Sequence, residues 1–323
     1  MEMKYKQMNE NEEVIIPPVE REVLKSELNK DNFFRKTNNA RNEIYIIDAH
    51  NSPNAMREVA RLREESFRQS GGGTGHPLDM DAFDTAEVPY KQLLVWDPDA
   101  QEIVGGYRFM CCWEVPQKPD GTPKIATAEL FRFSPAFIKD YLPYTIELGR
   151  SFVQPAYQPS RDNRKSIYSL DNLWDGLGGL IVDYPQLKYF VGKVTMYRHF
   201  DIYARDLILY FMQKFFPDPD GLIRPFDPLP LHTPVEKLEK VFTASTFQDN
   251  YRLLSTKVRK RNENIPPLFS SYMGLSPTMR GFGTALNKGF GGVEETGIMV
   301  TIKDIYDVKA RRHVDSFKKD QKH

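Results

Sequence analysis

The most constraining stretch of the sequence is YTIELGRSFVQPAY, residues 144–157. Its β-branched and aromatic side chains predict a strand, and the prolines near its two ends limit the extent of that strand. Two charged residues, Glu147 and Arg150, interrupt the apolar pattern. A charge inside a buried strand is costly unless it is paired, so these residues indicate either a structural ion pair or an active site.

Composition limits both the fold and its partners. A chain of 323 residues with 40% hydrophobic residues can bury a sizeable core, in one elaborated domain or two small ones. The formal net charge is zero, so we expect no nucleic acid partner. The only cysteines, Cys111 and Cys112, are adjacent, and the sequence shows no signal peptide or long apolar run. These features predict a cytoplasmic protein, and no histidine or cysteine spacing indicates a metal site.

Strands and helices are predicted to alternate irregularly. Residues 43–48, 92–96, 103–112, 145–153, 189–196 and 297–305 have the composition of strands. Apolar periodicity predicts helices over residues 53–69, 166–182 and 199–216, and more charged helices over residues 235–264. The glycine-rich stretch GFGTALNKGFGG does not match a Walker loop, because Lys288 is followed by glycine. This order predicts an α/β or α+β domain with a mixed central sheet flanked by helices.

Four motifs follow one another in an informative order. They are LREESF with Arg63 and Phe67, DMDAFD with Asp81 and Asp84, IVGGYRFM with Gly105 and Arg108, and IELGRSFVQPAY with Glu147 and Arg150. This ordered set resembles the acyltransferases related to acyl-homoserine-lactone synthases and to the N-acyltransferases of ornithine lipid and glycine lipid synthesis, some of which are labelled hemolysin. The resemblance implies a GNAT-like fold over residues 44–305 with a helical insertion at about 217–264. An N-terminal arm, residues 1–43, precedes this domain, and a basic tail, residues 306–323, follows it.

The resemblance also implies an acyl donor that carries phosphopantetheine, with no covalently bound cofactor. Acetyl-CoA enzymes of this fold have an Arg-Gly-Gly loop for the pyrophosphate at this point, whereas this chain has QPSRDNRKSIYS. We therefore expect acyl carrier protein as the donor, with acyl-CoA as the alternative. Arg161, Arg164 and Lys165 are predicted to bind the donor phosphate, unless they form an ordinary solvated face. Phe152 and Val153 are predicted to lie along the pantetheine arm, where a neighbouring strand at residues 189–196 splays away.

Transfer of an acyl group to an amine requires a base and a polarised carbonyl. We expect Glu147 to take the proton of the amine, unless it forms a salt bridge with one of the arginines. Arg150, together with Arg63 and Arg108, is predicted to hold the acceptor carboxylate or to fix the acidic residues. The remaining two candidates, Asp81 and Asp84, either order the loop over the acceptor or belong to a solvated turn.

We therefore predict a cytoplasmic N-acyltransferase that moves a (3-hydroxy) fatty acyl chain to a small amino acid, glycine or ornithine, in the biosynthesis of amino-acid-containing lipids. Transient attachment to the inner membrane surface is compatible with such a product. One alternative is a signal synthase that makes an N-acyl homoserine lactone. The other is a peripheral membrane-binding, hemolysin-like protein without catalytic activity.

Overall fold

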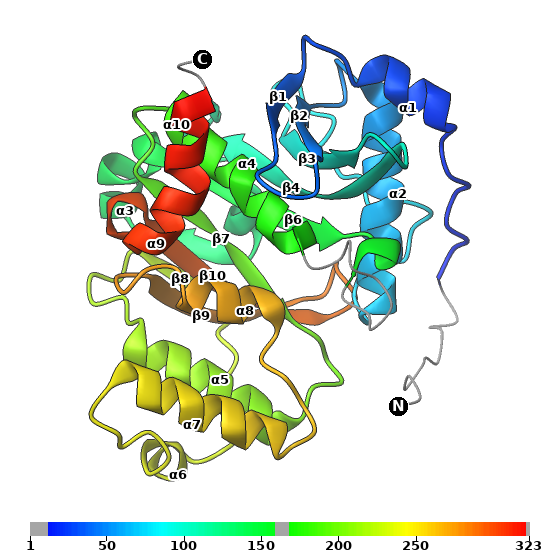
Figure 1. Ribbon diagram of the computed structural model, residues 1–323. Coiled ribbons are helices and arrows are strands. Elements are labelled where there is room, and N and C mark those ends of the chain that lie inside the picture. Colours follow the sequence, from blue (N-terminus) through cyan, green and yellow to red (C-terminus); the bar gives the residue numbers. More distant parts are fainter. Residues whose placement is uncertain (1–11, 159–167, 321–323) are drawn as a thin grey trace.

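A mixed sheet of eight strands forms the centre of the protein (Figure 1). The computed structural model describes residues 12–158 and 168–320. The strand order is β1-β2-β3-β4-β6-β7-β10-β9, and all neighbours are antiparallel except β6 and β7. The strands are β1 (Phe33–Lys36), β2 (Glu43–Ile47), β3 (Lys91–Asp97), β4 (Glu102–Cys111), β6 (Thr145–Val153), β7 (Tyr189–Met196), β9 (Arg280–Asn287) and β10 (Val293–Thr301). The mixed α/β fold predicted from the sequence is confirmed.

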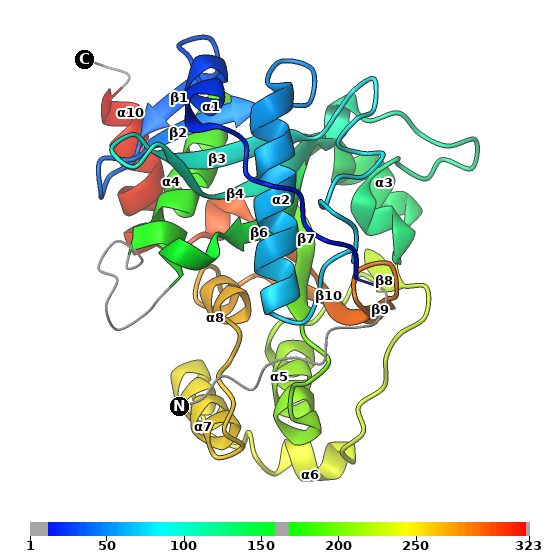
Figure 2. The same ribbon diagram turned by 90° about the vertical axis from the view of Figure 1, so that its right-hand side faces the viewer.

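Helices cover both faces of this sheet (Figures 1 and 2). One face packs against α2 (Pro53–Gln69), and the other packs against α4 (Ser169–Asp183), α5 (Ile202–Phe215) and α8 (Pro267–Met273). The shorter helices are α1 (Arg21–Glu27), α3 (Pro135–Asp140), α6 (Val235–Glu239), α9 (Asp307–Ala310) and α10 (Ser316–Asp320). Within the described ranges, no helix has both the length and the apolar character needed to cross a membrane.

The helix predicted over residues 53–69 matches α2, with proline in its first turn and its apolar side on the core. Alternation of side chains distributes β3 between the two cores: Leu93 and Val95 contact the α4 side, and Leu94 and Trp96 contact the α2 side. The elements missed by the sequence analysis include the edge strand β1 and the helix α3. The first part of the glycine-rich stretch is the strand β9.

Residues 217–264, predicted as a helical insertion, contain a strand as well as helices. In this region β8 (Ile223–Pro225) pairs with β5 (Phe131–Phe133) in a separate two-stranded sheet. Helix α7 (Phe247–Arg259) packs on α5 through aromatic rings, with Phe211 and Phe247 centroids 5.6 Å apart. These helices extend beyond the end of the main sheet (Figure 2).

The described parts of both chain ends are fastened to the domain. The segment before α1 runs along α2, where the Val19 N–H donates to Glu58 at 2.9 Å (Figure 2). Residues after β10 pack on α4, where His313 Nδ1 lies 2.8 Å from the buried Asp175 carboxylate. Arg35 lies in β1, and its guanidinium donates to the backbone carbonyls of both Asp175 and His313. The N-terminal strand, α4 and the C-terminal segment are therefore joined in one polar cluster.

Candidate active site

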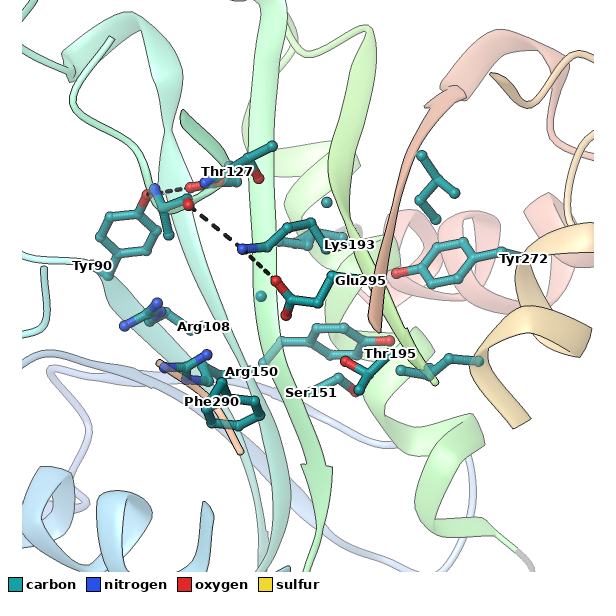
Figure 3. Close-up of a pocket in the computed structure, with 18 of the residues that line it drawn as sticks. Tyr90, Arg108, Thr127, Arg150, Ser151, Lys193, Thr195, Tyr272, Phe290 and Glu295 are labelled. Carbon is teal, nitrogen blue, oxygen red and sulfur yellow. Dashed lines mark hydrogen bonds and ion pairs between the residues drawn. The ribbon is translucent and has the colours of Figure 1, made fainter. Parts of the chain in front are cut away.

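The two parallel strands at the centre of the sheet separate partway along their length. Strands β6 and β7 pair only from Thr145↔Tyr189 to Leu148↔Gly192, although both continue beyond this point. A pocket opens at the separation, lined by Gly149–Ser151 on one strand and by Gly192, Lys193 and Thr195 on the other (Figure 3). A Cβ atom at Gly192 would lie 2.5 Å from the Leu148 carbonyl oxygen, so only glycine fits the last pair.

A β-bulge in β6 sets the direction of the side chains at this pocket. Arg150 and Ser151 together oppose Tyr107 of β4, and Arg150 has a φ of 48°. Before the bulge, Leu148 packs on the α4 face, whereas after it Phe152 packs on the α2 face. The extra residue therefore turns Arg150 toward the α2 side. A left-handed arginine is strained, and such strain is concentrated at functional sites.

Glu147 lies in the pocket wall and is held by neutral groups. Its side chain is 2% exposed, and one carboxylate oxygen accepts a hydrogen bond of 2.6 Å from the Thr127 N–H. The other oxygen accepts from the Tyr90 hydroxyl, which itself accepts from the Ala126 N–H at 2.9 Å. Burial and then the Glu147 charge raise the pKa of Tyr90 well above its usual value, so this hydroxyl stays a donor. Among the described residues, the Glu147 carboxylate contacts these neutral groups and forms no salt bridge with an arginine, which was the alternative prediction.

The predicted arginines and aspartates form a buried network beside the pocket. Arg63 is fully buried and contacts Asp79 at 3.1 Å and Asp84 at 3.0 Å. Burial raises the pKa of both carboxyl groups, but the arginines together outweigh it and hold each pKa below the usual value: Arg63 acts on both, with Arg150 at Asp79 and Arg108 at Asp84. Asp79, at the start of the DMDAFD motif, was not among the predicted site residues.

The other two arginines reach the pocket wall. Arg108 contacts Asp81 at 2.7 Å and lies over the Tyr90 ring. Arg150 contacts Asp79 at 2.8 Å, with its guanidinium carbon 4.1 Å from the centroid of the Phe290 ring. Arg63 does not line the pocket. The structure thus brings the predicted acidic and basic residues together, but mostly as partners of one another.

Two buried polar atoms in the pocket wall, Arg108 Nε and Thr127 Oγ1, have no hydrogen-bond partner among the described residues. The Tyr107 hydroxyl, also buried in this wall, interacts with the hydroxyls of Ser151 and Tyr272. Burial raises the pKa of Tyr107, and the nearby hydroxyls of Ser151 and Tyr272 act in the opposite direction. An unpaired buried polar atom costs about 1–3 kcal/mol, so two of them in one pocket indicate where a ligand supplies the missing partners.

A second ion pair in the pocket has no counterpart in the sequence prediction. Lys193 Nζ lies 2.8 Å from Glu295 Oε2, and both side chains are largely buried (Figure 3). Burial raises the pKa of Glu295, but Lys193 and then Arg150 outweigh this effect and lower it below the usual value. Lys193, Glu295, Tyr90 and Thr127 come from separate elements and form no motif, so only the fold brings them together.

Of the residues predicted to bind the acyl donor, those that the structure describes are not the ones that line the pocket. Phe152 packs in the core beneath α2, and neither it nor Val153 lines the pocket. Gly149, Arg150 and Ser151 occupy the place expected for them. Arg161, Arg164 and Lys165 lie outside the described residues. In the described part of the chain, no group of His, Cys, Asp or Glu is arranged to hold a metal ion.

Comparisons with known proteins agree with this geometry. Residues 62–164 match the family model of the Acetyltransferase (GNAT) domain. The glycine N(alpha)-acyltransferase of Phocaeicola vulgatus is 52% identical over 307 residues, which cover 95% of this chain and 94% of the relative. The glycine N(alpha)-acyltransferase of Bacteroides thetaiotaomicron is 53% identical over 305 residues, which cover 94% of this chain and 90% of the relative. No solved structure gives a significant match.

Proposed function

This chain belongs to the GNAT-like N-acyltransferases that include the glycine N(alpha)-acyltransferases, and we propose that it moves a 3-hydroxylated fatty acyl group from a phosphopantetheine thioester to the amine of glycine. The observation that carries this proposal is the pocket where β6 and β7 separate, with the buried Glu147 in its wall. The names and the coverage of the two relatives support glycine as the acceptor. Ornithine is the second candidate.

Glu147 is the proposed base. It takes one proton from the glycine ammonium, directly or through a water molecule. The free amine then attacks the thioester carbonyl carbon, so that a C–N bond forms and the C–S bond breaks. The remaining excess proton on nitrogen passes to the departing thiolate. Tyr90 and Thr127 fix the carboxylate for this task, because each donates a hydrogen bond to a different oxygen.

The separated strands suit the donor. Beyond Leu148, the edge of β6 that faces β7 has no pairing with that strand. Backbone N–H groups along such an edge are suited to bind the developing oxyanion and the amides of a pantetheine arm. The pocket has walls on both faces of the sheet. Tyr272 lies on the α8 side, and Arg108 and Glu147 lie on the side of the loop that contains the DMDAFD motif. Donor and acceptor would thus approach the reacting carbon from opposite faces.

The Tyr107 hydroxyl supports a hydroxylated acyl chain, because it belongs to a buried group of hydroxyls at the pocket. It is buried opposite the bulge, near the hydroxyls of Ser151 and Tyr272. The oxygen of a hydroxyl on the third carbon of the chain lies three bonds from the thioester carbonyl carbon, which places it close to this cluster when the carbonyl lies at the bulge. A site built to hydrogen-bond a substrate hydroxyl discriminates strongly against an analogue that lacks it.

The remaining parts of the proposal concern the setting of the reaction. We propose acyl carrier protein as the donor, with acyl-CoA as the alternative, because the sequence after β6 lacks the glycines of a pyrophosphate loop. The product would be an amino-acid-containing lipid, formed in the cytoplasm by an enzyme that contacts the inner membrane transiently. A product containing a lactone would favour the signal-synthase alternative instead.

Lipid mass spectrometry tests the reaction and the acceptor together. A heterologous host expresses either the wild type or Glu147→Gln and is fed isotope-labelled glycine or ornithine in separate cultures. We expect a new lipid labelled from glycine with the wild type alone. A lipid labelled only from ornithine would refute the choice of acceptor. The absence of any labelled lipid in cells that express the folded wild type would refute the proposed function.

A further inference from the structure

An amino acid acceptor carries a carboxylate that must be neutralised inside a largely buried pocket. Each of the three predicted arginines already contacts an aspartate, and among them Arg108 keeps one buried donor, Nε, without a partner among the described residues. Arg63 is also fully buried and outside the pocket wall. Within the network the three arginines are balanced by Asp79, Asp81 and Asp84. The remaining cation among the described residues that line the pocket is Lys193.

Lys193 has the required position. It follows Gly192, the last residue of β7 that pairs with β6, and its side chain enters the pocket (Figure 3). Its ammonium group donates to Glu295 at 2.8 Å and to the Ala126 carbonyl at 3.5 Å. An ammonium group has three hydrogens. Two of them have these partners, and the third is left for a ligand.

The peptide bond between Ala126 and Thr127 fixes the distance between Lys193 and the proposed base. Its carbonyl oxygen accepts from Lys193, and its N–H donates to Glu147 at 2.6 Å. With one peptide group between them, the ammonium and the carboxylate lie within about 8 Å of each other. One α-amino acid spans this gap, with its amine at Glu147 and its carboxylate at Lys193, at a hydrogen-bond distance of about 2.8 Å from each.

We propose that Lys193 recognises the carboxylate of the acceptor amino acid and thereby selects an α-amino acid over a simple amine. This inference rests on the proposed function. Thr127 supplies a second donor, because its hydroxyl is buried in the same wall without a partner among the described residues. Glu295 positions the lysine and is itself held by the Asn287 side chain at 3.1 Å.

The test compares glycine with glycinamide, which keeps the amine and lacks the carboxylate. Purified enzyme receives a 3-hydroxyacyl thioester, on acyl carrier protein and on CoA in separate reactions, and product is quantified by mass spectrometry. We expect the wild type to prefer glycine. Lys193→Gln should lower kcat/KM for glycine about 10- to 100-fold, mainly through KM, because one charged contact is lost. Activity with glycinamide should change less than about threefold, since that acceptor never used the contact.

Two variants separate recognition from folding. K193Q/E295Q replaces the ion pair by two amides of similar shape, so it avoids a buried unpaired carboxylate and should show the same loss of preference. Lys188→Gln is the matched control, because Lys188 is exposed just before β7 and lies over the Tyr144 ring. This control should leave both acceptors unchanged.

The outcomes distinguish the two proposals. If Lys193→Gln and the double variant lower activity with glycine and glycinamide equally, Lys193 is merely structural and the inference is overturned, while the proposed function stands. A wild type that acylates glycinamide as efficiently as glycine overturns the inference in the same way. A wild type that acylates neither acceptor overturns the proposed function and, with it, this inference.

Discussion

The left-handed bulge in β6 predicts which of two substitutions at Arg150 gives the more stable protein. Arg150 has a φ of 48°, a region that glycine enters freely and that costs other residues about 1 kcal/mol or more. Arg150→Gly and Arg150→Ala both remove the guanidinium. We therefore expect the glycine variant to be more stable than the alanine variant by about 1 kcal/mol.

Both variants should nevertheless be less stable than the wild type. The guanidinium contacts the fully buried Asp79 at 2.8 Å and lies over the Phe290 ring at 4.1 Å. A hydrogen bond between charged groups contributes about 1.5–3 kcal/mol, and a cation–π contact adds about 0.5–1 kcal/mol. Arg63 remains to pair Asp79. We therefore expect a loss of about 2–4 kcal/mol for Arg150→Ala and about 1–3 kcal/mol for Arg150→Gly.

Urea unfolding followed by fluorescence and circular dichroism measures these differences. Arg57, exposed in the second turn of α2, is the matched control, because glycine there should be about 1 kcal/mol less stable than alanine. The sign of the glycine–alanine difference should thus be opposite at the two positions. An Arg150→Ala variant as stable as Arg150→Gly would refute the left-handed bulge. Losses below about 0.5 kcal/mol in both would refute a stabilising role of the ion pair.

Three further predictions test other parts of the structure. Tyr107→Phe removes one hydroxyl from the buried group that it forms with Ser151 and Tyr272, so stability should fall by about 1 kcal/mol. Preference for a 3-hydroxyacyl over an unsubstituted donor should fall at least about tenfold in a competition assay, and an unchanged preference contradicts the donor proposal. Gly192→Ala places a Cβ against the Leu148 carbonyl and should cost about 2 kcal/mol or more in urea unfolding, so wild-type stability would contradict the close approach. Folding lowers the pKa values of Asp79 and Asp84, so the two ionised carboxylates stabilise the fold above about pH 4. This contribution to stability is lost as the pH falls below that value. Unfolding in urea at pH 5 and pH 3 measures this loss, and greater stability at pH 3 would contradict the buried network.

The features that sequence analysis anticipates are those with a contiguous signal. Helix α2 has proline in its first turn and a regular apolar periodicity, and its limits follow from these features. Strand β6 is bounded by prolines and contains Glu147, which does lie in a pocket wall. The pair formed by Lys193 and Glu295 has no such signal, because β7 and β10 become neighbours only through the strand order of the sheet.

The different locations of the arginines show a second limit. Arg63 and Arg108 were predicted to have the same role, yet Arg108 lines the pocket and Arg63 does not. Periodicity identifies the buried side of a helix, but it does not say whether that side meets a cavity or a carboxylate. The effect of the bulge on Arg150 was equally hidden, because an inserted residue reverses the alternation of a strand without a mark in its composition.

The polar cluster around Asp175 sets a limit on the order of folding during synthesis. Arg35 emerges from the ribosome early, but one of its hydrogen-bond acceptors is the carbonyl of His313, near the end of the chain. The β1 edge and α4 therefore cannot reach their final packing until the segment around His313 has been released. A nascent chain halted before His313 would present an unfinished surface on α4, open to chaperones or to a neighbouring chain, even though its central strands are already complete.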